Sequence, residues 1–277
     1  MNDTNSPILS SSEHIHLQKQ DCLNTDDMIL SNATLVCSIK REEKKNALSL
    51  DMYSALADAI ESANNDPEIK SIILTGSNGI FTSGNDLADF ANVADIGDKN
   101  NPIYRFMISL INSQKPLIAA VDGLAIGIGT TLLLHCDFAY CNPQASFRMP
   151  FVNLGLVPEF ASSLLVERLA GHKKACEWLL LGELFDAESA LEAGLVNSID
   201  PNPLGQALKT ASKLAFLPPK SVQVSKALIK HHTRDDMRDI IDIEIKAFLN
   251  ALQGDEFAEA VSAFFEKRSP NFNKCKN

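Results

Sequence analysis

The chain of 277 residues carries 25 Lys and Arg against 35 Asp and Glu, which gives a formal net charge of -10 at pH 7. A net acidic chain without a concentrated basic stripe does not attract a phosphate backbone, so general nucleic-acid binding is disfavoured. The longest nearly apolar run, residues 123–134, is shorter than the roughly 18 residues that a membrane-spanning helix needs. The composition therefore predicts a globular protein without nucleic-acid or membrane partners.

The cysteines and both ends of the chain bear on location. The six cysteines form no CxxC pair and no histidine has zinc-ligand spacing, so we expect reduced thiols and no metal site. Residues 1–31 are rich in Ser, Asn and Asp and lack a signal-peptide pattern, so we expect a disordered or loosely attached tail. The C-terminal residues 274–277 are not a peroxisomal address of the Ser-Lys-Leu kind. These features predict a cytoplasmic protein.

Strands, helices and glycine turns are predicted to alternate up to residue 140. A helix is predicted from Ser49, a favoured N-cap, to Asp66, which precedes a proline, and a second helix over 102–112. Short apolar or β-branched runs typical of strands occur at 34–39, 71–75, 117–121 and 137–140. This alternation predicts an α/β layer architecture with ligand chemistry in the turns that follow strands.

The remainder of the chain has helical periodicity, punctuated by glycine and proline. Helices are predicted over 159–169, 172–181, 187–193, 203–216, 219–231, 235–252 and 255–267. No fixed-period repeat and no long linker separates these segments from the first part. We therefore expect one α/β core with a helical C-terminal part.

Several common chemistries are disfavoured by missing motifs. The Gly127-x-Gly129 pair lacks the third glycine of the dinucleotide fingerprint, because Leu132 stands there, and no phosphate-binding GxxxxGK[ST] loop is present. No serine lies in a GxSxG elbow. NAD, ATP and serine-hydrolase chemistry are thus disfavoured.

Two turns are candidates for chemistry through the backbone. They are 83–86, which follows a strand, and 123–129, which enters a helix. Two convergent N–H groups can form an oxyanion hole, where charge that develops on a carbonyl oxygen is stabilised. Glycines also serve simply to permit tight turns and close packing. The residues alone leave both interpretations open.

Five segments resemble the enoyl-CoA hydratase/isomerase (crotonase) superfamily, over residues 33–272. They are FTSGNDL (81–87), KPLIAAVDGLAIGIG (115–129), CDFAY (136–140), ASFRMP (145–150) and GLVPEFASSLL (155–165). The resemblance implies a crotonase-like core of ββα units over 32–200. It also implies a helical region over 201–277 that completes the CoA site and builds homotrimers, often paired into hexamers. It requires no metal, and no cofactor besides the CoA of the substrate.

The resemblance assigns roles to backbone and side chains. It implies that the N–H groups of Asn85 and Ile128 form the oxyanion hole. Hydratases of this family use two glutamates, and at their positions this chain has Thr131 and Phe151. Because neither side chain can exchange a proton as a carboxylate does, hydration with two carboxylates is disfavoured.

Glu159 is the candidate base. Its Pro-Glu element resembles one branch of the Δ3,Δ2-enoyl-CoA isomerases, in which a single glutamate transfers the proton. A glutamate after a proline at a helix start is also favoured by the helix dipole alone, so a structural role stays open. Flanking Val157, Phe160 and Phe151 are expected to desolvate the carboxylate and raise its pKa.

Substrate contacts are implied by the resemblance in the first turn, at Phe151 and at cations that could meet CoA phosphates. They are Ser83, Gly84, Asp86, Leu87, Phe151, Lys44, Lys45 and Lys267, with Arg41 in the same segment as the first two lysines. The alternative interpretation is that these cations bind no ligand and are solvated or stabilise a helix end. The side chains of Asp86 and Asp122 are interpreted as turn-stabilising.

The first hypothesis is therefore an enoyl-CoA isomerase that shifts a 3-double bond to the trans-2 position. The alternative enzyme is another reaction on the same fold, such as enoyl-CoA hydration or thioester hydrolysis. A third class is a non-catalytic acyl-CoA-binding subunit. The absence of both hydratase glutamates is also what we expect of a protein that has kept the fold and lost the catalytic activity.

Overall fold

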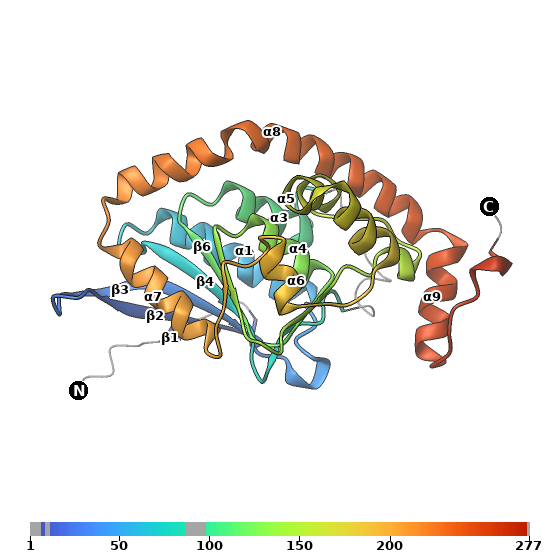
Figure 1. Cartoon of the computed structure of the whole chain (residues 1–277), viewed down its shortest axis with the longest axis horizontal. Coiled ribbons are helices and arrows are strands. Elements are labelled where there is room, and N and C mark those ends of the chain that lie inside the picture. The colour runs from blue at the N-terminus through green and yellow to red at the C-terminus, as the bar shows by residue number, and fades with distance from the viewer. Residues whose placement is uncertain (1–6, 9–11, 87–97, 276–277) are drawn as a thin grey trace.

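The computed structural model describes residues 7–8, 12–86 and 98–275, which form two sheets and the helices that cover them (Figure 1). The larger sheet has the strand order β1-β2-β3-β4-β6-β8-β11. Its strands are β1 (Pro7–Ile8), β2 (Ile15–Leu23), β3 (Ile29–Ile39), β4 (Ser71–Thr75), β6 (Leu117–Val121), β8 (Phe138–Cys141) and β11 (Ser198–Ile199). The smaller sheet has the order β10-β9-β7-β5. Its strands are β5 (Ile80–Thr82), β7 (Leu124–Ile126), β9 (Ser146–Arg148) and β10 (Phe185–Asp186).

The helices follow the chain in the order that Figure 1 labels. They are α1 (Leu50–Asn65), α3 (Pro102–Asn112), α4 (Ile128–Thr131), α5 (Ser162–Cys176), α6 (Ala187–Glu192), α7 (Pro203–Ala215), α8 (Pro219–Leu252) and α9 (Asp255–Phe265). Shorter turns of 3-10 helix are η1 (Glu42–Lys44), η2 (Leu132–His135), η3 (Val152–Leu154) and η5 (Phe272–Lys274), and η4 (Glu177–Leu181) is a π-helix.

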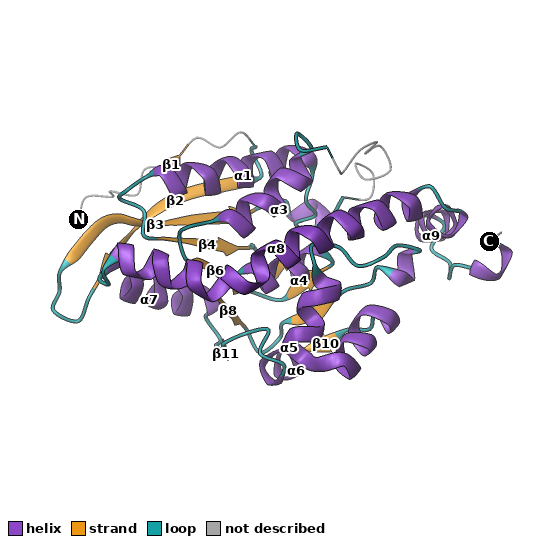
Figure 2. Ribbon diagram, turned by 90° about the horizontal axis from the view of Figure 1, so that it is seen from above, coloured by secondary structure: helices purple, strands orange, loops and turns teal. Residues whose placement is uncertain are grey.

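The parallel strands β3, β4, β6 and β8 form the centre of the larger sheet. Every residue of β4 and β6 is buried, as expected for a parallel sheet covered on both faces. Ile73 and Ile118 face Ala207 and Ala211 of α7 on one side. On the other side, alternate residues of the same strands join the main core with α1 and α3. The sheet therefore lies in a three-layer arrangement (Figure 2).

The smaller sheet brings the two candidate turns together. Strands β5 and β7 are parallel neighbours, so the turns at their carboxyl ends meet at one edge. Gly84 has a φ of 91°, and a Cβ there would lie 2.9 Å from the carbonyl oxygen of Ile126. A glycine is required at this position because the backbones of the two turns approach this closely.

Helix α8 is 34 residues long and arches over the side of the molecule that carries α3 and α5 (Figure 1). Two lysines attach it to the loop before β8. The buried Lys226 Nζ donates to Asp137 Oδ2 and to the carbonyl oxygen of Lys115, each at 2.6 Å. Lys230 Nζ donates to the carbonyl oxygen of His135 at 2.9 Å. The C-terminal helices are thus attached to the core and do not form a separate body.

The structure confirms most of the predicted elements and changes three. Residues 15–31, expected in a tail, belong to the sheet, because β2 and the first residues of β3 pair as antiparallel strands and bury Ile15, Leu17 and Cys22. Residues 1–6 and 9–11 lie outside the described part. The two helices expected over 219–231 and 235–252 are one helix, because the polar stretch between them holds no glycine or proline to end it. The helix expected from residue 159 begins at Ser162.

Replacement of Asp137 tests the attachment of α8. Asp137→Ala leaves the ammonium group of Lys226 buried without its carboxylate, so the free energy of unfolding should fall by about 3 kcal/mol. Urea denaturation measures it, and Asp236→Ala, which breaks the exposed pair with Arg168, is the matched control and should cost under about 1 kcal/mol. Equal effects would mean that the buried pair does not fasten α8.

Candidate active site

The first turn leaves one backbone N–H pointing away from its strand partner. Leu48 N donates to the Gly84 carbonyl at 2.8 Å and Asp86 N donates to the Leu48 carbonyl at 3.0 Å. In this parallel bridge the N–H of the intervening Asn85 faces the opposite side. Within the described residues no acceptor is found for it.

The second turn leaves a similar group. Ile128 is the first residue of α4, and the first N–H groups of a helix have no partner inside it. The N–H groups of Thr130 and Thr131 donate to the Gly127 carbonyl, whereas the Ile128 N–H finds no acceptor in the part of the chain that the structure describes. Two neighbouring turns therefore each present a backbone donor.

Glu159 is buried beside the second turn, with 6% of its surface exposed. Thr131 Oγ1 donates to Glu159 Oε1 at 2.6 Å, so the threonine that the resemblance matches to one hydratase glutamate contacts the candidate base. Burial raises the pKa of Glu159 to about 8, the Thr131 hydrogen bond opposes the rise, and the charge of Glu244 adds to it. The raised pKa expected from the sequence is confirmed.

Tyr53 connects Glu159 to the first turn. This α1 residue is buried, and its hydroxyl donates to Oδ1 of Asn85. The pKa of Tyr53 is raised, first by burial and then by the charge of Glu159, so the carboxylate lies close enough to act on the phenol. The carboxylate is thus hydrogen-bonded to the helix that starts at the second turn and is coupled electrostatically to the tyrosine that holds the first turn. Helical periodicity places Tyr53 on the apolar face of α1 but does not report where its polar hydroxyl points.

The backbone around Glu159 differs from the helix start that the sequence predicts. Phe160 and Ala161 have φ values of 58° and 57°, a left-handed conformation that residues with a Cβ rarely adopt. The carbonyl of Phe160 lies 2.8 Å from Nε2 of His135, and the two rings stack with centroids 3.7 Å apart. Glu159 stands before the first turn of α5, so the helix dipole alone does not explain it.

The apolar residues expected to shield Glu159 belong to the main core. Phe151, at the other hydratase-glutamate position, is buried, and its carbonyl accepts from the N–H groups of Leu154 and Leu156. Phe160 is 1% exposed, and Val157 packs against the same core. Position 151 therefore supplies an apolar ring and no second carboxylate.

The predicted phosphate contacts fall into two groups. Arg41 Nη1 donates to Asp86 Oδ2 at 2.9 Å and to the Ala47 carbonyl, so this pair stabilises the first turn and the Arg41 candidate is not supported. Lys44 and Lys45 are exposed, and their carbonyl groups accept from the hydroxyl and the N–H of Ser83. The two ammonium groups therefore extend into solvent from a segment that touches the candidate site.

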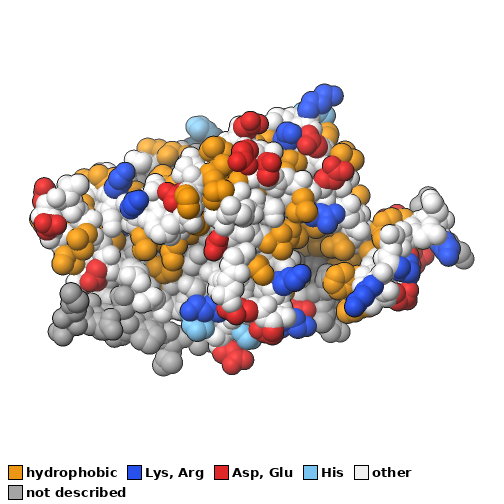
Figure 3. Space-filling model, turned by 60° about the horizontal axis from the view of Figure 1, so that its bottom comes forward, with side chains coloured by type: hydrophobic (Ala, Val, Ile, Leu, Met, Phe, Trp, Pro, Cys, Tyr) orange, Lys and Arg blue, Asp and Glu red, His pale blue; other side chains and the backbone are white. Residues whose placement is uncertain are grey.

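Two further predictions concern the ends of the site. Lys267 is exposed and follows α9, and α9 itself begins against Gly155, where a Cβ would lie 2.6 Å from the Glu256 backbone. Figure 3 shows the molecule hollowed between its main body and this C-terminal arm, with hydrophobic side chains at the hollow.

Leu87 lies outside the described residues. Asp122 accepts from the Asn142 side chain, as expected for a turn-stabilising residue.

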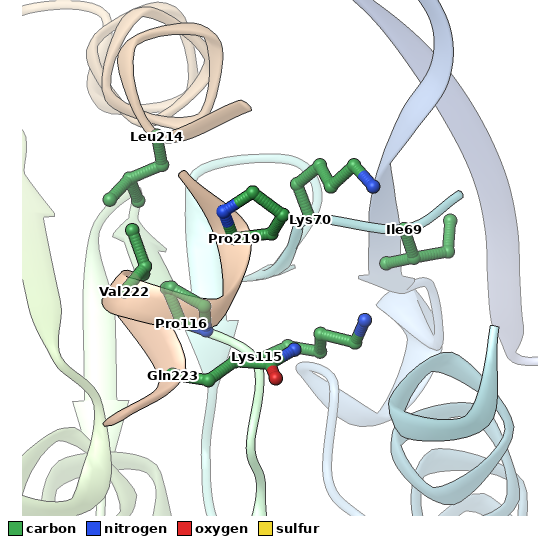
Figure 4. A pocket seen from close by; sticks show the side chains of 8 residues that line it. All are labelled: Ile69, Lys70, Lys115, Pro116, Leu214, Pro219, Val222 and Gln223. Atoms are coloured by element: carbon green, nitrogen blue, oxygen red, sulfur yellow. The ribbon is translucent and has the colours of Figure 1, made fainter. Parts of the chain in front are cut away.

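A small pocket lies elsewhere in the fold. Its lining residues include Lys70 and Lys115, which stand at the amino ends of β4 and β6 (Figure 4). The donor turns stand at the carboxyl ends of their strands, so this pocket does not belong to the candidate site. In the described residues no group of three His, Cys, Asp or Glu side chains is placed to hold a metal ion.

Comparison with known proteins identifies the family. The model of the enoyl-CoA hydratase/isomerase family matches residues 30–275, so the chain belongs to this family. It is 30% identical to peroxisomal enoyl-CoA delta isomerase 3 of Mus musculus, over 91% of this chain and 80% of that protein. It is 31% identical to crotonyl-CoA hydratase of Syntrophomonas wolfei, over 86% of this chain and 93% of that protein.

The fold agrees with solved structures of the family. The structure of OdaA from Pseudomonas aeruginosa superposes with a TM-score of 0.85 and 40% identity, over 91% of this chain and 99% of the other. The expected crotonase-like fold is therefore confirmed. None of the helices in the described segments is long and apolar enough to cross a membrane.

Burial of Glu159 should make stability depend on pH. Its pKa is higher in the folded state, so its contribution is fully present below the ordinary value near 4.5 and is lost as the pH rises to about 8. Glu159→Gln keeps the shape without the charge. The Tm of the variant should therefore rise relative to that of the wild type as the pH increases from 5 to 8. The expected shift is about 2 to 4 °C for each kcal/mol of unfolding free energy that the wild type loses. Melting curves across this range test it, and a constant difference would contradict a buried, uncharged Glu159.

Proposed function

We propose that the protein is an enoyl-CoA isomerase that moves a 3-double bond of an acyl-CoA thioester to the trans-2 position. The observation that carries the proposal is one buried carboxyl group, Glu159, with a raised pKa beside two turns that each present a backbone N–H. A proton shift along an acyl chain requires one base and a stabilised enolate, and these groups supply both.

The reaction proceeds through a dienolate. The carboxylate of Glu159 removes a proton from C2 of the 3-enoyl thioester, and the electron pair moves onto the thioester oxygen. The N–H groups of Asn85 and Ile128 hold that oxygen while it is negative. The protonated Glu159 then donates the same proton to C4, and the double bond forms between C2 and C3. The step needs no metal, and no cofactor other than the CoA of the substrate.

Hydration is disfavoured because it needs a second carboxylate that faces the substrate. The buried acidic residues of the described chain are Asp86, Glu159 and Glu244. Asp86 binds Arg41, and Glu244 accepts from the N–H groups of Ala161 and Ser163. Thr131 and Phe151 occupy the places of the two hydratase glutamates. The mouse isomerase and the bacterial hydratase are about equally similar to this chain, so the argument rests on these side chains.

CoA binding is assigned to the rim of the site. Lys44 and Lys45 project from the segment whose carbonyl groups bind Ser83, and Lys267 lies on the C-terminal arm. Ammonium groups in solvent can meet phosphates without loss of an existing ion pair. The turn from Ser83 to Leu87, together with Phe151, is assigned to the thioester and the first carbons of the acyl chain. A cytoplasmic location stays a prediction, because the printed name of the mouse relative places that protein in peroxisomes.

Isomerase assays with two substrates test the proposal. Wild-type protein given a 3-enoyl-CoA should produce conjugated enoyl-thioester absorbance, and Glu159→Gln should lower kcat about 1,000-fold because the proton carrier is lost. Since the base must be ionised, kcat/KM should rise with pH up to about 8.

The second substrate provides the contradicting outcome. A trans-2-enoyl-CoA loses its conjugated absorbance when an enzyme adds water across its double bond. Loss of absorbance from this substrate with no turnover of the 3-enoyl-CoA would replace the proposal with hydration. Binding of both thioesters without turnover of either would instead indicate an acyl-CoA-binding subunit.

We further propose that the chain assembles into homotrimers or hexamers. Large apolar side chains on the outer faces of α8 and α9 are mostly exposed in the single chain. They include Leu228, Ile229, Ile243, Phe264 and Phe265, each at least 60% exposed. Apolar side chains concentrated on two successive helices are typical of a surface covered by another chain.

Sedimentation equilibrium tests the assembly. The mass should be three or six times 30.2 kDa, and Ile229→Asp should shift it toward one chain, because a charge cannot be buried unpaired in the contact. Leu23→Asp, an exposed apolar residue of β2, is the control and should leave the mass unchanged. A wild-type mass of one chain at micromolar concentration would contradict the assembly.

A further inference from the structure

Glu244 is a buried carboxyl group that the proposed reaction does not use. It lies on α8 and is 6% exposed. Its oxygens accept from three neutral donors, the N–H of Ala161 at 2.6 Å, the N–H of Ser163 at 3.0 Å and the hydroxyl of Ser163. Among the described residues no Lys or Arg lies within salt-bridge distance of it. Buried carboxylates are usually paired with cations, so this arrangement requires a reason.

The donors belong to the segment that carries Glu159. Ala161 is the N-cap residue of α5 and Ser163 is its second residue, so Glu244 accepts from N–H groups that have no partner inside the helix. Phe160 and Ala161, next to each other in this segment, both have left-handed backbone, a conformation that persists only where the surroundings enforce it. His135 holds the Phe160 carbonyl from one side and Glu244 holds the Ala161 N–H from the other.

Glu244 also contributes to the electrostatics of the base. The titratable groups that face Glu159 are Tyr53 on α1 and Glu244 on α8, and His135 on η2 faces the next residue. Burial raises the pKa of Tyr53 and lowers that of His135 to about 3, so both are neutral near pH 7. Burial also raises the pKa of Glu244, and its hydrogen bonds with Ser163 and Ala161 oppose that rise. In its ionised form, Glu244 favours the protonated form of Glu159.

The geometry points to Glu244 as a positioning residue: it fixes the strained turn before α5, so that the Glu159 carboxylate is held against Thr131 of α4, and it brings a second carboxyl group into the surroundings of the base. The role of Glu159 as the base comes from the proposed function. The placement of Glu159 by Glu244 follows from the hydrogen bonds alone. Helix α8 therefore supports catalysis from 83 residues away in sequence.

Three variants test geometry and charge. Glu244→Gln removes the charge and, with it, the acceptor for the Ala161 N–H, and keeps one acceptor for Ser163. Glu244→Asp keeps the charge but withdraws it by one methylene group from Ala161. Asp242→Asn is the matched control, because Asp242 is an exposed carboxylate on the same helix. For each variant, kcat, KM and the pH dependence of kcat/KM are measured on 3-enoyl-CoA, and circular dichroism establishes the folded fraction.

The expected results differ among the variants. Glu244→Gln should move the acidic limb of the kcat/KM profile to lower pH, because Glu159 loses a neighbouring negative charge. Glu244→Asp should leave that limb near the wild-type position and lower kcat about 10- to 100-fold with little change in KM, because the base is displaced. Asp242→Asn should match the wild type. A folded Glu244→Gln with the wild-type limb, or a folded Glu244→Asp with the wild-type kcat, would overturn the inference.

A measurement that does not depend on activity separates this inference from the proposed function. The pKa of Glu159 is followed by carboxyl 13C NMR, with Glu159→Gln identifying its resonance. A lower pKa in Glu244→Gln than in the wild type supports the inference even where no isomerase activity is found, and an unchanged pKa overturns it. Absence of activity in the wild type, with the shifted pKa present, would refute the isomerase proposal alone.

Discussion

The hydrogen bond between Thr131 and Glu159 is the constraint on which the site depends. Thr131 holds an acidic side chain inside the protein. Burial favours the uncharged form of Glu159 and raises its pKa to about 8, and the hydrogen bond opposes part of that rise. The same burial that lowers stability at alkaline pH makes the carboxylate a stronger base once it is ionised. A weak carbon acid such as the C2 position of a thioester requires such a base. Stability and reactivity are therefore coupled at one residue.

The fold meets this constraint from several sides. The parallel pairing of β5 with β7 brings the two glycine turns within contact, and Gly84 permits the approach. Glu159 directly precedes the strained turn at Phe160 and Ala161, and this turn is held by His135 and by Glu244. Attachment of α8 through Lys226 and Asp137 keeps Glu244 in place. The long helix thus acts on the chemistry through backbone hydrogen bonds.

Much of the fold follows from local pattern. The sequence predicts buried strands such as Ser71–Thr75 and Leu117–Val121, because a strand buried on both faces is a continuous apolar run. It predicts the helix that starts at Leu50 because burial of one helix face gives apolar residues at helical spacing. The strand from Ile15 to Leu23 was missed because its charged and polar residues hide the alternation, and only its pairing with β3 reveals it.

Only part of the candidate site could be predicted from the sequence. The Pro-Glu element and the two glycine turns stand in recognisable segments, so the resemblance predicts Glu159, Asn85 and Ile128 as candidate site residues. The supporting residues Tyr53, His135 and Glu244 lie on three separate helical elements and touch the site only after folding. Nothing in their local sequence distinguishes them from core or surface positions. Arg41 had the right charge and segment, but its contact with Asp86 is a tertiary feature.

The central claim is that one shielded carboxyl group carries a proton from C2 to C4. The most direct test is a single turnover of 3-enoyl-CoA deuterated at C2, in ordinary water, with the trans-2 product analysed by mass spectrometry and NMR. The account predicts that part of the deuterium appears at C4, because the buried Glu159 returns the atom it removed before solvent exchange is complete. A product without deuterium at C4, at the earliest times and at every pH, would contradict transfer by a single buried base.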